Sequence, residues 1–190
     1  MLTRCAWPQD HDLMIRYHDE EWGVPLHDDR KLFEFIILDT FQAGLSWKTI
    51  INKRENFSKA FDAFDYTKIA LYDETKVQSL MQDAGIIRNQ LKIRACIGNA
   101  KAFMNIQAEF GSFDAYLWAF VDGKPIVNLF TRLSQIPART PLSDKLSKDL
   151  TKHGFKFVGS TIVYAFMQAA GLVNDHTVEC FRRQQIIDLY

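Results

Sequence analysis

The chain of 190 residues has few cysteines, no long apolar run and no excess of charge of either sign. Its three cysteines cannot all pair with one another, which favours the free thiols of a cytosolic protein over a disulfide framework. No apolar run approaches the length needed to cross a membrane. The opening segment MLTRCAWPQDHD lacks the apolar stretch of a signal peptide. We therefore expect a cytoplasmic protein that has no membrane partner.

The charges of the chain balance, with 23 Lys and Arg residues against 23 Asp and Glu residues. This argues against a protein that binds nucleic acid through bulk electrostatic attraction, although a DNA enzyme with a local basic patch stays compatible with it. Nearly half of the residues, 47%, are hydrophobic. A chain of this length and composition can bury one good core or two small lobes.

The sequence also lacks the alternating pattern and the short hairpin turns that predict strands. Apolar residues instead recur at helical spacing, and this pattern predicts an all-α fold. Helices are expected near residues 12–21, 31–41, 47–61, 90–111, 113–121, 144–152 and 160–171, with a loop at 131–141 and short helices after residues 65 and 73. The expected helix starts are Asp12, Asp28 or Asp29, Ser46, Asp65, Asp73, Asn89 or Gln90, Ser143, and Ser160 or Thr161.

One segment, residues 77–93, resembles a helix–hairpin–helix. Helical spacing stops at Gly85, two isoleucines follow, and a new periodic run begins. In versions of this motif that bind DNA, backbone N–H groups and the start of the second helix face a phosphate. Lys92 and Arg94 lie in the first turns of that helix. The alternative is an ordinary helical corner with solvated basic residues, and the second glycine of such hairpins is missing.

Residues that commonly bind metals occur in two pairs at opposite ends of the chain. Twelve residues separate Cys5 from His18, and three separate His176 from Cys180. The second spacing predicts two side chains on one face of a helix, one turn apart. Together the pairs form a Cys2His2 set, which suits tetrahedral zinc. Each pair alone is also compatible with buried cysteines and partly buried histidines that bind nothing, and the CxxC half of a zinc finger is absent.

Large aromatic residues gather in the first quarter of the chain, close to Cys5 and His18. They are Trp7, Tyr17, Trp22 and Trp47. Such residues most often belong to a core, but flat rings with a polar tip are also what a pocket for an extruded base requires.

Asp39 is an acidic residue in an apolar context. It shares one stripe of its predicted helix with Leu32, Ile36 and Ala43. It also lies near the C-terminal end of that helix, where the helix dipole disfavours a negative charge. An inward carboxylate there needs a cationic partner, a donor or a ligand. The alternative is a partly exposed residue at a frayed helix end.

A series of motifs runs in order along nearly the whole chain: RCAW at 4–7, YHDEEWGVP at 17–25, QAGLSW at 42–47, KREN at 53–56, DAGIIR at 83–88, IGNA at 97–100, GFKFVG at 154–159 and GLVNDH at 171–176. In these motifs the sequence resembles the 3-methyladenine-DNA glycosylase I family of bacterial base-excision repair enzymes. The resemblance implies an all-α, two-lobed helix–hairpin–helix glycosylase fold. Residues 1–190 would form a single domain, with a central lobe at about 65–125 and a lobe in which structural zinc holds both chain ends.

The resemblance also implies a reaction and the residues that perform it. The enzyme would flip 3-methyladenine out of double-stranded alkylated DNA and hydrolyse its N-glycosidic bond, acting as a monomer and releasing the free base. The implied zinc ligands are Cys5, His18, His176 and Cys180. The implied base-binding residues are Trp7, Tyr17, Asp39 and Trp47, of which Tyr17 and Asp39 are catalytic. The expected DNA-binding residues are Gly44, Leu45, Gly85, Lys92, Arg94 and Lys156.

The chain departs from the family pattern at three positions. Asp39 replaces the usual glutamate, Thr40 replaces a glycine, and Met14 stands where a tyrosine often lines the pocket. The shorter carboxylate makes one other function worth considering, a DNA-damage binding module with impaired catalysis. A second alternative is a zinc hydrolase that acts on a small molecule, which requires an open coordination position.

Overall fold

The computed structural model describes residues 2–190, and most of its regular structure is helical. Among these residues no helix is long and apolar enough to cross a membrane. The α-helices are α1 (Asp12–Glu20), α2 (Asp29–Gln42), α3 (Trp47–Ile51), α4 (Arg54–Ala60), α5 (Tyr66–Ile69), α6 (Glu74–Gln82), α7 (Gln90–Phe110), α8 (Phe113–Trp118), α9 (Pro141–Lys152), α10 (Ser160–Ala169) and α11 (Phe181–Ile187). Short 3₁₀ helices are η1 (Asp62–Phe64), η2 (Ala119–Val121) and η3 (Leu133–Gln135).

Most of the predicted helix starts are confirmed by the hydrogen bonds of their caps. In each case a side-chain oxygen accepts from a backbone N–H in the first turn, which would otherwise lack a partner. These N-caps are Asp28, Ser46, Asp65, Asp73 and Asn89. The start of α10 at Ser160 is also confirmed.

Two helix starts differ from the prediction. His11, not Asp12, caps α1, because its Nδ1 accepts from the backbone of Met14. Helix α9 begins at Pro141, because the Thr140 hydroxyl caps the helix three residues earlier than expected, and proline at the first helical position needs no N–H partner.

The expected single helix over residues 47–61 is two helices, α3 and α4, separated at Asn52 and Lys53. The break turns the chain, so that Arg54 at the start of α4 reaches the acidic residues Glu21 and Glu34.

A short parallel pairing of β1 (Ile126–Val127) with β2 (Val173–Asn174) is the feature that the sequence pattern missed. Two residues per strand are too few to give an alternating signal. The pairing holds the segment after α10, which carries the motif at 171–176, beside the loop that follows η2.

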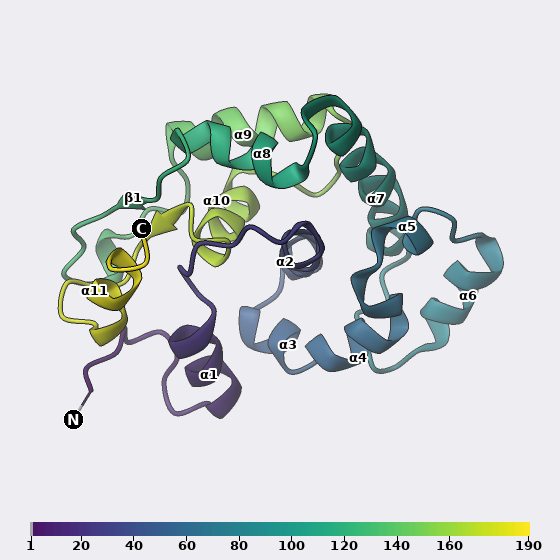
Figure 1. Cartoon of the computed structure of the whole chain (residues 1–190). Helices are drawn as coiled ribbons and strands as arrows, with labels where there is room; N and C mark the ends of the chain where they lie inside the picture. The colour runs from purple at the N-terminus through teal and green to yellow at the C-terminus, as the bar shows by residue number, and fades with distance from the viewer. Residues whose placement is uncertain (1) are drawn as a thin grey trace.

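Helix α2 is the centre of the fold. Ten of its 14 residues are buried, and it packs against α3, α7, α8 and α10. In Figure 1, α2 lies inside an arc formed by α7, α8, α9 and α10. A helix that is buried around its whole circumference holds its side chains firmly, and this helix carries Asp39.

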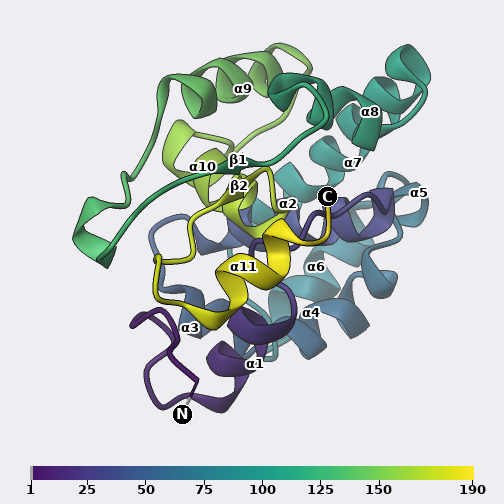
Figure 2. The same ribbon diagram turned by 60° about the vertical axis from the view of Figure 1, so that its left-hand side comes forward.

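The two ends of the chain meet on one side of the molecule. Phe181 N donates to Thr3 O at 2.9 Å, and Figure 2 shows α11 next to α1, with the N-terminal segment below. The turn after α1 also runs along the end of α10, since Gly23 N donates to Gln168 O at 2.9 Å and Leu26 N donates to Ala170 O at 3.1 Å.

Gly171 is required at this contact. Its φ is +77°, and a Cβ atom there would lie 2.5 Å from backbone atoms of Val24 and Pro25. Only glycine combines this dihedral with such a close approach.

We predict that Gly171→Ala lowers the free energy of unfolding by about 2 kcal/mol or more, because strained dihedrals alone cost about 1–3 kcal/mol. Chemical denaturation measures the change. Gly98→Ala is the matched control: Gly98 lies in α7 with open space around it, and alanine there should stabilise the helix by about 0.5–1 kcal/mol. Equal stability of the two variants would contradict the close approach.

Candidate functional site

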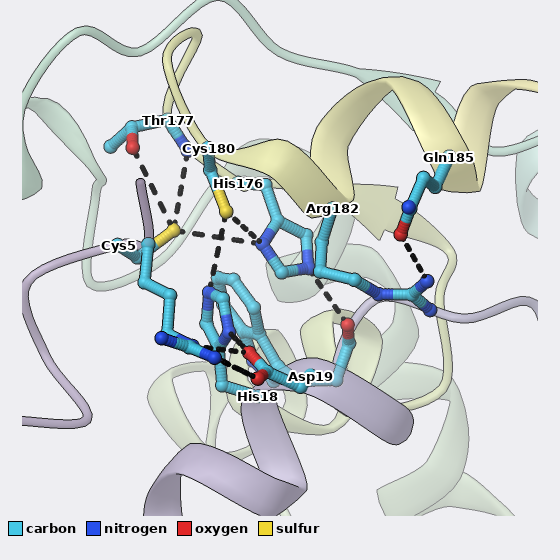
Figure 3. Close-up of polar contacts among 10 residues, drawn as sticks. Cys5, His18, Asp19, His176, Thr177, Cys180, Arg182 and Gln185 are labelled. Atoms are coloured by element: carbon cyan, nitrogen blue, oxygen red, sulfur yellow. Dashed lines mark hydrogen bonds and ion pairs between the residues drawn. The ribbon is translucent and has the colours of Figure 1, made fainter. Parts of the chain in front are cut away.

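Four buried side chains from the two ends of the chain converge on one point. The ligand atoms of Cys5, His18, His176 and Cys180 all lie within 4.8 Å of one another, and Figure 3 shows the four side chains pointing inward. Sγ of Cys5 lies 3.6 Å from Nδ1 of His176, and Sγ of Cys180 lies 3.3 Å from Nδ1 of His176 and 3.5 Å from Nε2 of His18.

The expected helical arrangement of His176 and Cys180 is wrong. His176 follows β2 in an irregular segment, and Cys180 is the extended N-cap residue of α11. The segment is not helical, because Asn174 is paired in β2 and its side-chain oxygen accepts from the backbone N–H of His176 at 3.3 Å. The side chains of His176 and Cys180 are brought together by a turn and not by a shared helical face.

The other nitrogen of each histidine ring is held by an acceptor. Nε2 of His176 donates to the Trp22 carbonyl at 2.9 Å, and Nδ1 of His18 donates to Asp19 at 2.7 Å. Arg4 in turn donates to both oxygens of Asp19. Such contacts fix the ring tautomer and leave the inward nitrogen unprotonated, as metal ligation requires.

The geometry fits a tetrahedral metal ion. Bonds of about 2.3 Å to sulfur and about 2.0 Å to nitrogen place neighbouring ligands about 3.5 Å apart, close to the measured separations. The backbone N–H of Thr177 donates to the Cys5 sulfur at 3.4 Å. A hydrogen bond from Cys5, helped by both histidines, lowers the pKa of the Cys180 thiol, whereas the same contact raises the pKa of Cys5. Cys180 is therefore the thiol of the pair that loses its proton more readily.

A cavity of about 350 Å³ lies beside the cluster. Trp7, Tyr17, Asp39 and Trp47 line it, which brings the four predicted base-binding residues together. Trp22, which the sequence analysis grouped with these aromatic residues, also lines the cavity. The sequence reasoning did not assign the other lining residues to the pocket, and these are Gln42, Leu133, Ile136, Ala165 and Gln168.

The aromatic walls of the cavity contact one another and the Cys–His cluster. Tyr17 and Trp47 have ring centroids 5.0 Å apart, and Trp7 and Trp22 have centroids 5.1 Å apart. Trp22 also packs edge to face on His176, with centroids 4.6 Å apart. The cluster therefore positions the rings that form one side of the cavity.

Three polar atoms at the cavity are buried and have no hydrogen-bond partner among the described residues. They are Oδ2 of Asp39 and the indole nitrogens of Trp7 and Trp47. Asp39 is only 2% exposed, and burial raises the pKa of its carboxyl group well above the ordinary range of an aspartate. Burial also raises the pKa of Tyr17, and the Asp39 charge adds to the effect, so the hydroxyl stays a donor. Unpaired buried groups cost free energy unless a ligand satisfies them.

A larger cavity of about 540 Å³ lies on the other side of Tyr17, and its charged groups are already paired. Arg54 donates to both oxygens of Glu21 at 2.7 Å and to Glu34 at 2.7 Å. Because these charged groups already satisfy one another, the aromatic cavity is the candidate site.

Gly44 and Gly85, two of the residues expected to bind DNA, lie in turns. Gly44 has a φ of +79° immediately after α2, and Leu45 beside it is 41% exposed. The hairpin is braced at Gly85, whose N–H donates to Asp83 at 2.7 Å, while Lys53 donates to the Ala84 carbonyl at 2.9 Å. Both turns present backbone to solvent.

Of the three basic residues predicted to contact DNA, Arg94 and Lys156 are exposed. Arg94 pairs with Glu74 at 2.7 Å. Asn99 of α7 holds the backbone of Lys156 through two hydrogen bonds, at 2.8 and 3.1 Å. Their contact with DNA stays a prediction.

Lys92 does not occupy the exposed position that was expected. It is 7% exposed, and its ammonium donates to the carbonyls of Phe41 at 2.8 Å and Ala43 at 2.5 Å. These carbonyls end α2, where partners are missing within the helix. Lys92 therefore ties α7, which follows the hairpin, to the turn that carries Gly44 and Leu45.

A family model described as methyladenine glycosylase matches residues 7–183. The chain belongs to the methyladenine glycosylase family.

Relatives in this family match the chain over nearly its full length. DNA-3-methyladenine glycosylase 1 of Escherichia coli is 52% identical over 94% of this chain and 96% of its own. The DNA-3-methyladenine glycosylase of Haemophilus influenzae is 46% identical over 95% and 97%. A crystal structure of 3-methyladenine DNA glycosylase I has a TM-score of 0.92 at 51% identity, covering 94% of this chain and 98% of its own. The family members thus confirm the predicted fold.

We predict that Cys180→Ser releases bound metal and lowers the free energy of unfolding by about 3 kcal/mol or more, because it removes one member of a buried charged cluster. The midpoint of thermal unfolding should fall by about 6–12 °C. Elemental analysis and calorimetry measure both effects. Cys96→Ser, the same change at a buried thiol outside the cluster, should keep the metal. Unchanged metal content and stability in Cys180→Ser would contradict the assignment.

We predict that Lys92→Met lowers the free energy of unfolding by about 1–3 kcal/mol, the cost of leaving buried carbonyls without a partner. Because the ammonium is buried, the salt dependence of DNA binding should keep its slope. Lys156→Met serves as the comparison, and loss of one exposed phosphate contact should reduce that slope by about 1. If Lys92→Met reduces the slope instead, its ammonium contacts phosphate.

Proposed function

We propose that the aromatic cavity receives 3-methyladenine flipped out of alkylated duplex DNA and that Asp39 and Tyr17 act on the bound base. As a member of its family, the protein removes 3-methyladenine from DNA. A related 3-methyladenine DNA glycosylase I, 34% identical and with a TM-score of 0.92, has been determined in complex with 3-methyladenine. The proposal concerns how this chain's own residues perform the reaction.

The observation that carries the proposal is the buried carboxylate of Asp39 among aromatic rings. No cation faces its Oδ2 atom among the described residues, and that atom accepts no hydrogen bond. An adenine methylated at N3 carries positive charge in DNA, and it also offers an amine donor. Such a ligand supplies both the charge and the donor that Asp39 lacks.

The aromatic rings favour the same ligand. Tyr17 and Trp47 present faces on which a cationic purine can stack, and a desolvated cation–π contact is worth about 2 kcal/mol. Neutral adenine lacks this attraction. The pocket therefore selects the damaged base by its charge, while the cost of flipping is smaller for a lesion than for a normal base pair.

Little acid catalysis is needed, because the positive charge already weakens the glycosidic bond. The bond from the sugar carbon to N9 breaks, and its electron pair neutralises the base. A water molecule then adds to the sugar carbon and loses a proton. Asp39 accepts a hydrogen bond from the exocyclic amine, and the Tyr17 hydroxyl donates to the base. Both groups are held in place before the base enters, which is the main source of catalysis proposed here.

The DNA contacts come from turns on the same chain. Leu45 and Gly44 enter the gap that the flipped nucleotide leaves, and the hairpin at Gly85 faces a phosphate. Arg94 and Lys156 add local positive charge. The protein is proposed to act as a monomer. Its single domain has a central lobe at about 65–125 and a lobe built from the chain ends.

Zinc is the proposed ion of the Cys–His cluster, because two thiolates and two imidazoles in a tetrahedron suit it. It would be structural: four protein ligands leave no position for an activated water. This disfavours the zinc hydrolase considered from the sequence. The remaining rival is a module that binds damaged DNA without releasing the base.

We predict opposite effects of Asp39→Asn on activity and stability. Release of 3-methyladenine and affinity for the free base should fall together by about 1–3 kcal/mol, because a charge-assisted hydrogen bond is lost. Burial raises the pKa of Asp39 in the folded state. At low pH the carboxyl group is protonated in both the folded and the unfolded chain, so it does not affect stability. As the pH rises above the ordinary range of an aspartate, the unfolded chain loses this proton first, and the free energy of unfolding decreases. The variant should therefore be more stable than the parent at neutral pH and equally stable near pH 3.

Chromatography of bases released from methylated DNA and denaturation at both pH values test this prediction. Asp39→Glu is the matched charged control, and it should keep or raise the activity because it restores the family's usual length. An active Asp39→Asn variant would remove the carboxylate from the mechanism. A parent protein that binds the lesion without releasing a base would favour the binding module.

A further inference from the structure

We propose that Gln168 is a second hydrogen-bond acceptor of the base pocket, which recognises the exocyclic amine of the adenine and rejects a purine with a 6-oxo group. The inference rests on the proposed function of the pocket and deepens it. It assigns a specificity-determining role to a side chain on α10, which is far from Asp39 in sequence.

Gln168 is held firmly at the cavity. Its side chain lines the same space as Asp39 and is half-buried. Its backbone carbonyl accepts from Gly23 at 2.9 Å, and α10 packs directly on α2. The residue therefore has little freedom to move away from a bound base.

Asp175 fixes which end of the Gln168 amide faces away from the cavity. Nε2 of Gln168 donates to Oδ2 of Asp175 at 2.8 Å. Asp175 is 1% exposed and also accepts from the Tyr164 hydroxyl at 2.6 Å and from Asn128 at 2.6 Å. A carboxylate that only accepts must face the amide nitrogen and not the amide oxygen. The oxygen of Gln168 is thus left as the free end of the side chain.

This oxygen is accessible and has no hydrogen bond within residues 2–190. The Nε2–Asp175 contact is the only one that the Gln168 side chain makes there, and its oxygen is not among the fully enclosed polar atoms. A half-buried acceptor that is oriented by a buried carboxylate, and that lines a cavity, is available to a ligand.

The polar groups of the cavity match the edge of an adenine. An adenine methylated at N3 offers two amine hydrogens as donors and N1 and N7 as acceptors. The cavity offers two acceptors, Asp39 and Gln168, and the unpaired indole donors of Trp7 and Trp47. A 6-oxo purine places an acceptor where the amine was, so it opposes protein acceptors and leaves them unpaired. Sites built around a hydrogen bond reject such analogues strongly.

The test compares two free bases that differ only at the amine, 3-methyladenine and 3-methylhypoxanthine. Their dissociation constants are measured at one pH by calorimetry with the parent protein and with Gln168→Met, which keeps the length of the side chain but has no acceptor oxygen. The parent should prefer 3-methyladenine, and Gln168→Met should reduce this preference about tenfold, the effect of one lost hydrogen bond of about 1.4 kcal/mol. The ratio of 3-methyladenine to 3-methylguanine released from the same methylated DNA should fall in parallel.

The ratio of the two dissociation constants does not change when part of the protein is unfolded, so it separates base recognition from stability. Gln78→Met makes the same change at an exposed glutamine of α6 that does not line the cavity, and it should keep the parent's preference. If Gln168→Met does not fold, Asp175→Asn tests the same claim, because it frees the amide to turn its nitrogen inward and should also reduce the preference. A Gln168→Met variant with the parent's preference, or an equal loss in Gln78→Met, would overturn the role of Gln168. Failure of the parent to bind either base would instead refute the proposed function.

Discussion

The contact between the two ends of the chain, at Cys5, His18, His176 and Cys180, is the constraint on which the site depends. Cys5, His176 and Cys180 lie outside helices and strands, whereas His18 lies in the last turn of α1. His176 contacts Trp22. Trp7 lies two residues after Cys5, and Tyr17 immediately precedes His18. A metal ion in the cluster would therefore hold three walls of the cavity while it takes no part in the chemistry, because binding energy at such a site is folding energy.

The second feature is an unfavourable free energy, which comes from burying a carboxyl group in the pocket without a hydrogen-bond partner. Asp39 lies on the most deeply buried helix, without a partner on its Oδ2 atom, and its pKa is raised by that burial. Proteins keep such groups where a ligand completes them. Lys92 satisfies the carbonyls of Phe41 and Ala43 at the end of α2, next to the turn that carries Gly44 and Leu45. Its buried ammonium group thereby ties the helix that follows the hairpin to the helix that carries Asp39.

Helix starts and site residues could be predicted from the sequence where the signal is local. Asp28 and Asn89 cap their helices as expected, because a capping side chain and its N–H partner lie within three residues. Asp39 was expected to point inward from the apolar stripe of its helix, and it does. The burial of Lys92 could not be predicted, since its acceptors lie about fifty residues away in sequence. The same holds for Gln168, whose role depends on Asp175 and on the fold that brings α10 to α2.

The central claim is that the free protein holds a buried carboxyl group at Asp39 whose charged form is stabilised when the amine of a methylated adenine donates to it. Carbon NMR of the Asp39 carboxyl group, titrated with and without 3-methyladenine, tests this claim most directly. The account predicts a pKa well above the ordinary range of an aspartate in the free protein and a decrease of that pKa when the base binds. A pKa in the ordinary range that does not respond to the base would contradict it.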